Sequence, residues 1–239
     1  MPPCSTRWAF FLDIDGTLLD IAETPDAAEA GRREKSLVRR LHDAANGALA
    51  LVSGRSLAAI DELFAPLKLA AAGQHGIERR DAQGRVHRGD YPHKPLRRAA
   101  KKIGDFAARH EGLVFEDKGT SFSLHYRLAP ELADAARGAV REAAAEVGDW
   151  LEVQHGKMVV ELKPAGRDKG VAIEEFLHEA PFAGRSPVFI GDDVTDEDGF
   201  RVVNRVGGHS VKVGSGRTVA RWQVEDPAAA RAWLQQCLI

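Results

Sequence analysis

Three short runs of consecutive apolar residues constrain the fold of this chain more than any other feature. They cover residues 8–12, 48–52 and 187–190, and apolar and polar residues do not alternate within them. Such runs are typical of strands buried on both faces, as in a parallel sheet covered by helices. Residues 27–46, and those from 56 to about 64, have helical patterns that complete a βαβ rhythm. We therefore predict an α/β fold with a doubly wound, mostly parallel sheet.

The middle of the chain has a different pattern. Residues 120–127 alternate apolar and polar side chains, which is typical of an antiparallel strand with one face in water or over a ligand. Residues 131–147 carry apolar side chains at helical spacing. After residue 164 the earlier pattern returns. We predict a discontinuous core, residues 1–79 and 166–239, with an inserted α+β domain at residues 80–165.

Charge and cysteine content exclude several classes of protein. The 239 residues include 33 Lys and Arg against 35 Asp and Glu, whereas nucleic-acid binders usually carry a large basic excess. No apolar run approaches the roughly 20 residues that cross a bilayer, and the N-terminal segment lacks the features of a signal peptide. Cys4 and Cys237 form neither a metal-ligand spacing nor a disulfide framework, so we expect two thiols. These observations predict a cytoplasmic protein that binds neither nucleic acid nor a membrane.

Polar residues follow each of the three apolar runs. They are residues 13–17, 53–55 and 191–193. Because the carboxyl ends of parallel strands meet at one edge of a sheet, where ligands bind, we expect the three segments to form a single site.

Five carboxylates would crowd together at this edge: Asp13, Asp15, Asp192, Asp193 and Asp196. Their mutual repulsion would reach several kcal/mol in a partly dehydrated pocket. A bound cation relieves that repulsion, and a site made only of carboxylate oxygens favours Mg²⁺.

The same edge would also attract an anion. Gly16 and Thr17 let backbone N–H groups approach an anion closely, and Ser53 supplies a hydroxyl. Lys169 stands at a predicted helix start and adds positive charge. An anion site beside a metal and a carboxylate nucleophile indicates phosphoryl transfer.

These segments, in this order, resemble the four motifs of the haloacid dehalogenase superfamily. Further segments resemble the trehalose-6-phosphate phosphatase family, and the likeness extends over essentially the whole chain. They are residues 73–78, 116–119, 124–127, 161–164 and 191–197. The resemblance implies a haloacid dehalogenase-like core with an inserted cap domain that selects the substrate.

The resemblance also implies roles for the core residues. Asp13 would attack phosphorus and form an aspartyl-phosphate, while Asp15 would act as general acid and then as general base. Mg²⁺ would be held by Asp13, the main-chain oxygen of Asp15, and Asp192. Asp193 and Asp196 would orient the metal's waters and Lys169. The phosphate would be bound by Gly16, Thr17, Ser53, Gly54 and Lys169.

The substrate's sugar would be bound by the cap. Glu116, Lys118 and Glu161 would bind the distal glucose, although the same three residues could form a surface ion-pair cluster instead. Substrate contacts are also expected at Gln74, His75, Gly76 and Arg55. For His75, and likewise for His125, a purely structural role is an equal alternative. Arg55 could equally brace its loop through a carboxylate.

The function implied by the resemblance is Mg²⁺-dependent hydrolysis of trehalose 6-phosphate to trehalose and phosphate, the last step of trehalose synthesis. The partners would be this small-molecule substrate and, as a further candidate, the upstream synthase. One alternative is a broader sugar-phosphate phosphatase with the same fold. Another is a non-catalytic regulatory domain that binds trehalose 6-phosphate, but the intact Asp13 and Asp15 pair argues against it.

Overall fold

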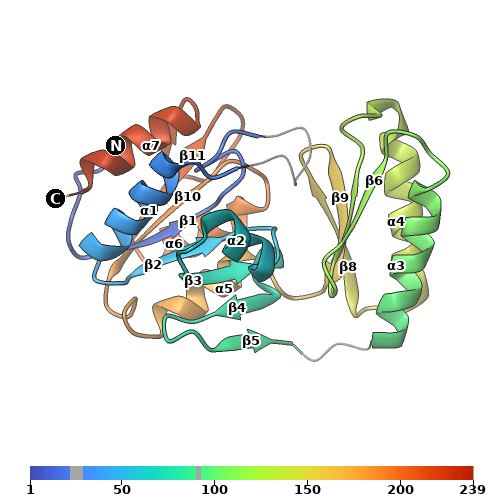
Figure 1. The fold of residues 1–239 in the computed structure, drawn as a ribbon, viewed down its shortest axis with the longest axis horizontal. Coiled ribbons are helices and arrows are strands. Elements are labelled where there is room, and N and C mark those ends of the chain that lie inside the picture. The colour runs from blue at the N-terminus through green and yellow to red at the C-terminus, as the bar shows by residue number, and fades with distance from the viewer. Residues whose placement is uncertain (22–28, 90–92, 239) are drawn as a thin grey trace. The chain divides into compact units, whose positions relative to one another are not determined.

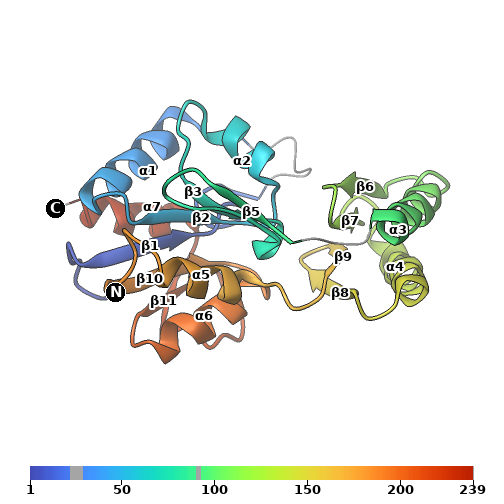
Figure 2. The ribbon, with the colours of Figure 1, turned by 90° about the horizontal axis from the view of Figure 1, so that it is seen from below.

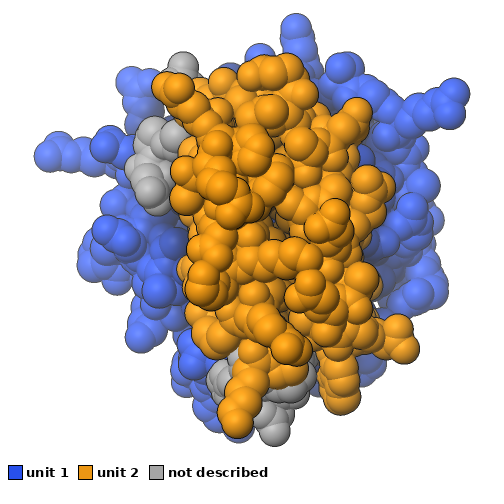
Figure 3. All heavy atoms as spheres, turned by 90° about the vertical axis from the view of Figure 1, so that its right-hand side faces the viewer, with its two compact units in different colours: residues 1–88, 168–239 blue, residues 89–167 orange. Residues whose placement is uncertain are grey.

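A computed structural model describes residues 1–21, 29–89 and 93–238 of the chain. It divides into two compact units, residues 1–88 with 168–239 (unit 1) and residues 89–167 (unit 2), coloured separately in Figure 3. Among the described residues, no helix combines the length and the apolar character that a membrane crossing requires.

Unit 1 contains an eight-stranded sheet. Its strands are β1 (Trp8–Leu12), β2 (Leu49–Val52), β3 (Ala70–Gly73), β4 (Glu78–Arg80), β5 (Val86–Arg88), β10 (Ser186–Gly191), β11 (His209–Val213) and β12 (Trp222–Val224). The order across the sheet is β12-β11-β10-β1-β2-β3-β4-β5. All pairings from β12 to β3 are parallel, and β4 and β5 continue the sheet antiparallel. The mostly parallel α/β fold is therefore confirmed.

The predicted boundary between core and insert lay at residue 80. The structure places the first break after residue 88 and the second after residue 167. The reason is that β4 and β5 extend the large sheet by pairing with β3, instead of joining the insert. Strand β5 is exposed along its whole length, so its short sequence carries no apolar run that would mark it as part of the core.

Helices cover both faces of this sheet, as Figure 2 shows edge-on. They are α1 (Arg32–Ala44), α2 (Leu57–Phe64), α5 (Lys169–Leu177), α6 (Asp196–Arg205) and α7 (Pro227–Gln236). Helices α1, α2 and α7 lie on one face and α5 and α6 on the other. The coverage explains why every residue of β1 and β2 is buried, which is the pattern that their unbroken apolar sequence predicts.

Two of the helix starts are set by local capping residues. The Ser56 side chain accepts a hydrogen bond from the Ala59 N–H at 3.2 Å and begins α2. The Asp168 side chain accepts one from the Val171 N–H at 2.8 Å, so α5 begins at Lys169. Helix α1 starts at Arg32, later than predicted, and residues 22–28 lie outside the described residues.

Unit 2 is a four-stranded antiparallel sheet with helices packed on it (Figure 1). Its elements are α3 (His93–Ala107), β6 (Val114–Asp117), β7 (Phe122–His125), the short turn η3 (Pro130–Leu132), α4 (Ala133–Val147), β8 (Leu151–Gly156) and β9 (Val159–Pro164). The strand order is β6-β7-β9-β8. Phe122 and Leu124 enter the apolar core of this unit, as their alternation predicts. Ser123, expected on a half-exposed face, is only 1 % exposed, and in register it stands between the longer side chains of Glu116 and Glu161.

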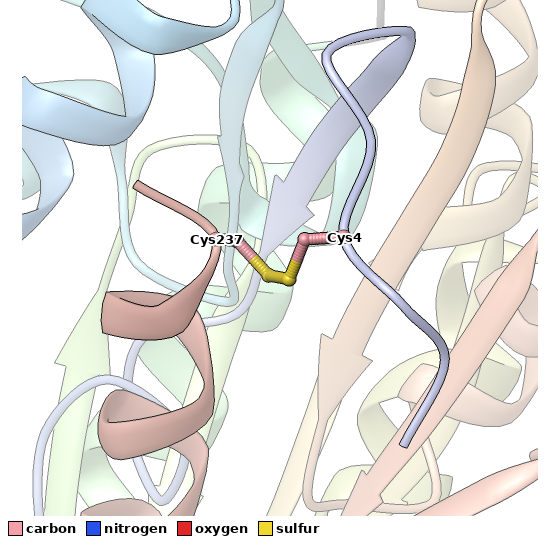
Figure 4. The surroundings of a disulfide bond; sticks show 2 residues. All are labelled: Cys4 and Cys237. Carbon is pink, nitrogen blue, oxygen red and sulfur yellow. A yellow bond between two sulfur atoms is a disulfide. The ribbon is translucent and has the colours of Figure 1, made fainter. Parts of the chain in front are cut away.

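The prediction of two separate thiols was wrong. Cys4 and Cys237 form a disulfide that joins the two ends of the chain, with Cα atoms 5.1 Å apart (Figure 4). The two residues are 233 positions apart in sequence, so no local pattern could pair them. They meet because α7 returns to the segment before β1, where the rings of Trp8 and Trp233 lie 6.0 Å apart.

Candidate active site

The three predicted polar segments do meet at one edge of the large sheet. Strand β1 lies between β10 and β2, and all three run parallel, so the segments that follow them emerge side by side. Asp13, Asp192 and Asp196 each present a carboxylate oxygen there, and these oxygens lie within 4.8 Å of one another. Asp196 reaches the cluster from the first turn of α6, where the positive end of the helix dipole stabilises acidic side chains.

Lys169 lies against this acidic cluster. Its Nζ donates to Asp13 Oδ1 at 2.8 Å and to Asp196 Oδ1 at 2.6 Å. All three side chains are buried, and Asp196 is completely so. Burial opposes the charge of Lys169, but the two carboxylates raise its pKa above the ordinary value, so it stays protonated. Burial raises the pKa of Asp13, while Lys169 acts in the opposite direction.

Glycines at two positions let the carboxylates approach the backbone. Gly16 has φ +78°, and a Cβ on it would stand 2.2 Å from Asp192 Oδ2. A Cβ on Gly191 would stand 2.2 Å from Asp196 Cγ. Neither position accepts a larger residue without movement of an acidic side chain, so both glycines are part of the geometry of the cluster.

Asp15 pairs with Arg55 and not with the cluster. Arg55 Nε donates to Asp15 Oδ2 and Arg55 Nη2 donates to Asp15 Oδ1, both at 2.7 Å. This two-bond geometry is the strong form of an arginine–carboxylate pair. Of the two roles considered for Arg55, bracing a carboxylate is therefore seen, and a substrate contact stays a prediction.

Ser53 and Gly54 lie against the turn Gln74–Gly76. The carbonyl oxygens of Ser53 and Arg55 accept hydrogen bonds from the N–H groups of His75 and Gln74, at 3.0 and 2.8 Å. Gln74 and His75 both have positive φ, 49° and 56°, which is uncommon for non-glycine residues. The His75 ring stands so near Gly54 that a Cβ there would be 2.7 Å from His75 Nε2.

Sequence reasoning missed Glu78, which holds this region together. Its buried carboxylate accepts from the Leu57 N–H at 2.7 Å and from Gln74 Nε2 at 3.2 Å, so it links the start of α2 to the strained turn. Glu78 is the last residue of segment 73–78, one of the segments that carry the family resemblance. Its place in that segment was the only sign in the sequence that it has a role here.

Lys212 was also missed. It stands on β11, and its Nζ donates to the main-chain oxygen of Asp192. The signal was a charged residue between two buried valines, Val211 and Val213, because such a residue must be buried with a partner.

Unit 2 carries a polar cluster of its own. Lys118 Nζ lies 3.2 Å from Glu161 Oε1 and 3.8 Å from Glu116 Oε2, and His125 Nε2 lies 2.9 Å from Glu116 Oε2. Burial raises the pKa of Glu116, but the hydrogen bond with His125 and the charge of Lys118 outweigh it and lower that pKa overall. The trio predicted from the sequence is thus brought together, with His125 added.

Thr17 and Asp193 also lie beside the acidic cluster. Thr17 Oγ1 lies 3.4 Å from Asp13 Oδ2. Asp193 turns its carboxylate to the Val194 N–H, at 2.8 Å, and its own N–H donates to Asp196 Oδ2 at 2.9 Å. Asp196 therefore accepts with both oxygens, from Asp193 and Lys169, and serves to orient its neighbours. The atoms of the cluster that could bind a metal ion are carboxylate oxygens, which suit a hard divalent cation.

Comparison with known proteins identifies the family. Residues 11–230 match the trehalose-phosphatase family. The chain belongs to this family. It is 42% identical over 234 residues to the trehalose-6-phosphate phosphatase of Escherichia coli K12, covering 98% of this chain and 88% of that one. It is 48% identical over 209 residues to a probable trehalose-phosphate phosphatase of Sinorhizobium fredii, covering 87% and 78%.

Solved structures of the trehalose-phosphatase family and of related phosphatases share the fold. The crystal structure of a trehalose-6-phosphate phosphatase related protein superposes with a TM-score of 0.82 at 28% identity, covering 96% of both chains. The C-terminal domain of the C. albicans trehalose-6-phosphate phosphatase gives 0.87 at 21% identity, covering 98% and 93%. A haloacid dehalogenase superfamily phosphatase from Bacteroides thetaiotaomicron gives 0.64 at 15%, covering 100% and 99%. The predicted superfamily fold is confirmed.

Proposed function

We propose that this chain hydrolyses trehalose 6-phosphate to trehalose and inorganic phosphate through an aspartyl-phosphate on Asp13. The observation that supports it most is the buried contact of Lys169 with Asp13 and Asp196 beside Asp192, in a member of the trehalose-phosphatase family. A buried ammonium between carboxylates is suited to stabilise the charge on a phosphoryl group in transfer.

In the first step a carboxylate oxygen of Asp13 forms a bond to phosphorus as the bond from phosphorus to the sugar oxygen breaks. Asp15 gives that oxygen a proton, and trehalose leaves. Since Arg55 engages both oxygens of Asp15, one of these hydrogen bonds must be exchanged for the sugar oxygen. Lys169 keeps its charge and its position throughout.

In the second step water attacks phosphorus and the bond to Asp13 breaks. Asp15, now ionised, accepts the proton of that water, so phosphate leaves and both aspartates return to their starting state. Asp13, Asp192 and the main-chain oxygen of Asp15 would hold Mg²⁺, which when bound neutralises charge on the phosphoryl oxygens. Asp193 and Asp196 would keep that arrangement and Lys169 in place.

Substrate selection is assigned to unit 2 as a cap domain. Glu116, Lys118 and Glu161 would bind the hydroxyl groups of the distal glucose, since hydrogen bonds to charged groups are roughly twice as strong as neutral ones. In unit 1, the turn Gln74–Gly76 and Arg55 are the proposed contacts nearer the phosphate. The upstream synthase remains the candidate protein partner.

The proposed compartment is the cytoplasm, as the sequence predicts. The disulfide between Cys4 and Cys237 bears on this, because disulfides are rare in cytoplasmic proteins of mesophilic organisms. Fractionation of cells that produce the chain tests the compartment separately from the pairing, and recovery outside the cytoplasm would refute this proposal.

The experiment is a panel of trehalose 6-phosphate, glucose 6-phosphate and sucrose 6-phosphate, with and without Mg²⁺. We expect Mg²⁺-dependent phosphate release from the first and far slower release from the others. Equal rates on all three would favour the broader phosphatase. Asp13→Asn should abolish turnover and still bind trehalose 6-phosphate, whereas binding without turnover in the unmodified chain would indicate the regulatory alternative.

A further inference from the structure

Lys212 is a buried cation to which the proposed reaction assigns no role. Its side chain stands on β11, where the residue pairs in register with Gly191 of β10, and it is only 6 % exposed. Its Nζ donates to the main-chain oxygen of Asp192. Within the described residues, no carboxylate oxygen lies within 4.0 Å of this nitrogen, the limit for an ion pair.

This environment differs from that of the other buried lysines. Lys169 contacts two carboxylates, and Lys163 lies 2.6 Å from Glu152. Burying a charge without an opposite charge costs several kcal/mol, so a lysine that contacts only a carbonyl needs a further reason. A hydrogen bond from a charged donor is roughly twice as strong as a neutral one, which suits a role in holding that carbonyl firmly.

The carbonyl belongs to the peptide that carries the acidic cluster. In the peptide unit between Asp192 and Asp193, the C=O accepts from Lys212 and the N–H donates to Asp196 Oδ2 at 2.9 Å. Because a peptide unit is planar and rigid, contacts on both sides fix its orientation. Its orientation in turn sets the direction of the Asp192 side chain, which shares the cluster with Asp13 and Asp196.

We propose that Lys212 is a positioning residue for Asp192 and, through it, for divalent-cation binding. It holds the peptide from one side while Asp196 holds it from the other, so the Asp192 carboxylate stays directed at the cluster. This role rests on the proposed function, in which Asp192 is a ligand of the cation.

The test measures Mn²⁺ binding without substrate, by the loss of the free-ion electron paramagnetic resonance signal and by calorimetry. Lys212→Met keeps an unbranched side chain up to the ε position but removes the donor, and we expect it to weaken Mn²⁺ binding about tenfold or more. Lys212→Arg keeps a charged donor and should restore most of that loss. The matched control is Lys163→Met, which removes another buried lysine that donates to a main-chain carbonyl, that of Arg167, and should leave Mn²⁺ binding unchanged.

Kinetics separate positioning from a general structural role. In Lys212→Met the Mg²⁺ concentration for half activation should rise about tenfold, while KM for trehalose 6-phosphate stays the same. Unchanged Mn²⁺ affinity in folded Lys212→Met, or an equal loss in Lys163→Met, would overturn the role. If circular dichroism shows Lys212→Met unfolded, Lys212→Leu, which also lacks a donor, is read in the same way. Absence of Mn²⁺ binding in the unmodified protein would instead refute the proposed cation site itself, and this role with it.

Discussion

Replacing Gly16 by alanine tests whether the turn after β1 shapes the acidic cluster. The residue has φ +78°, and the added Cβ would meet three atoms of Asp192: Oδ2 at 2.2 Å, Cγ at 2.4 Å and Oδ1 at 2.7 Å. Rotation of the carboxylate cannot relieve the collision, because all three atoms lie inside 3.0 Å. To reach an ordinary contact of 3.4 Å, Asp192 must move by about 1.2 Å.

Two separate effects follow from this geometry. The positive φ alone costs about 1 kcal/mol of unfolding free energy when a Cβ is present. The displacement of Asp192 is far larger than the ~0.2 Å by which a metal–ligand distance can vary, so this ligand would be lost to the cation. We expect Gly16→Ala to unfold at a slightly lower urea concentration and to bind Mn²⁺ at least about tenfold more weakly.

Gly84 offers a matched control. It lies in the turn between β4 and β5 with φ +84°, and a Cβ there would meet nothing within 4 Å. Gly84→Ala should lose the same ~1 kcal/mol in urea unfolding and keep full Mn²⁺ affinity in calorimetry. If Gly16→Ala binds Mn²⁺ as tightly as Gly84→Ala does, Asp192 is not a ligand held by this turn and the reasoning fails.

Three further predictions concern other parts of the chain. Reducing Cys4–Cys237 opens a loop of 233 residues and should lower the unfolding free energy by at most about 5 kcal/mol. Titration in denaturant should detect no free thiol before reduction and two free thiols after it. Two free thiols before reduction would contradict the pairing. Burial opposes the charge of Asp81, but hydrogen bonds, first among them the one with His87, lower the pKa of its carboxyl group. The charged Asp81 therefore stabilises the fold above the ordinary pKa of 3.8, and this stabilisation is lost as the pH falls through the lowered pKa. Asp81→Asn should therefore cost about 2 kcal/mol in urea unfolding at pH 7 and less at pH 3, and an equal cost at both would disprove the charge effect. Glu161→Ala should abolish hydrolysis of trehalose 6-phosphate and spare an aryl phosphate, whereas equal losses would show a role in folding or in the core chemistry.

The architecture of unit 1 could be predicted because its information is local. An unbroken apolar run such as residues 8–12 is typical of a strand covered on both faces, and parallel strands place their carboxyl ends at one edge. The meeting of Asp13 with Asp192 followed from that rule alone. Strand β5 could not be predicted in the same way, since its three residues are exposed and carry no periodic signal.

The sequence by itself determined the kind of fold and the chemistry at its edge, because strand burial and motif order are written in short stretches of chain. Only the tertiary structure decided which side chains pair across long separations. Arg55 with Asp15, Lys212 with the Asp192 carbonyl, and Cys4 with Cys237 are such pairs. Each depends on how separate strands and helices are brought together, and a charged or sulfur-containing side chain carries no local sign of the partner that it will meet.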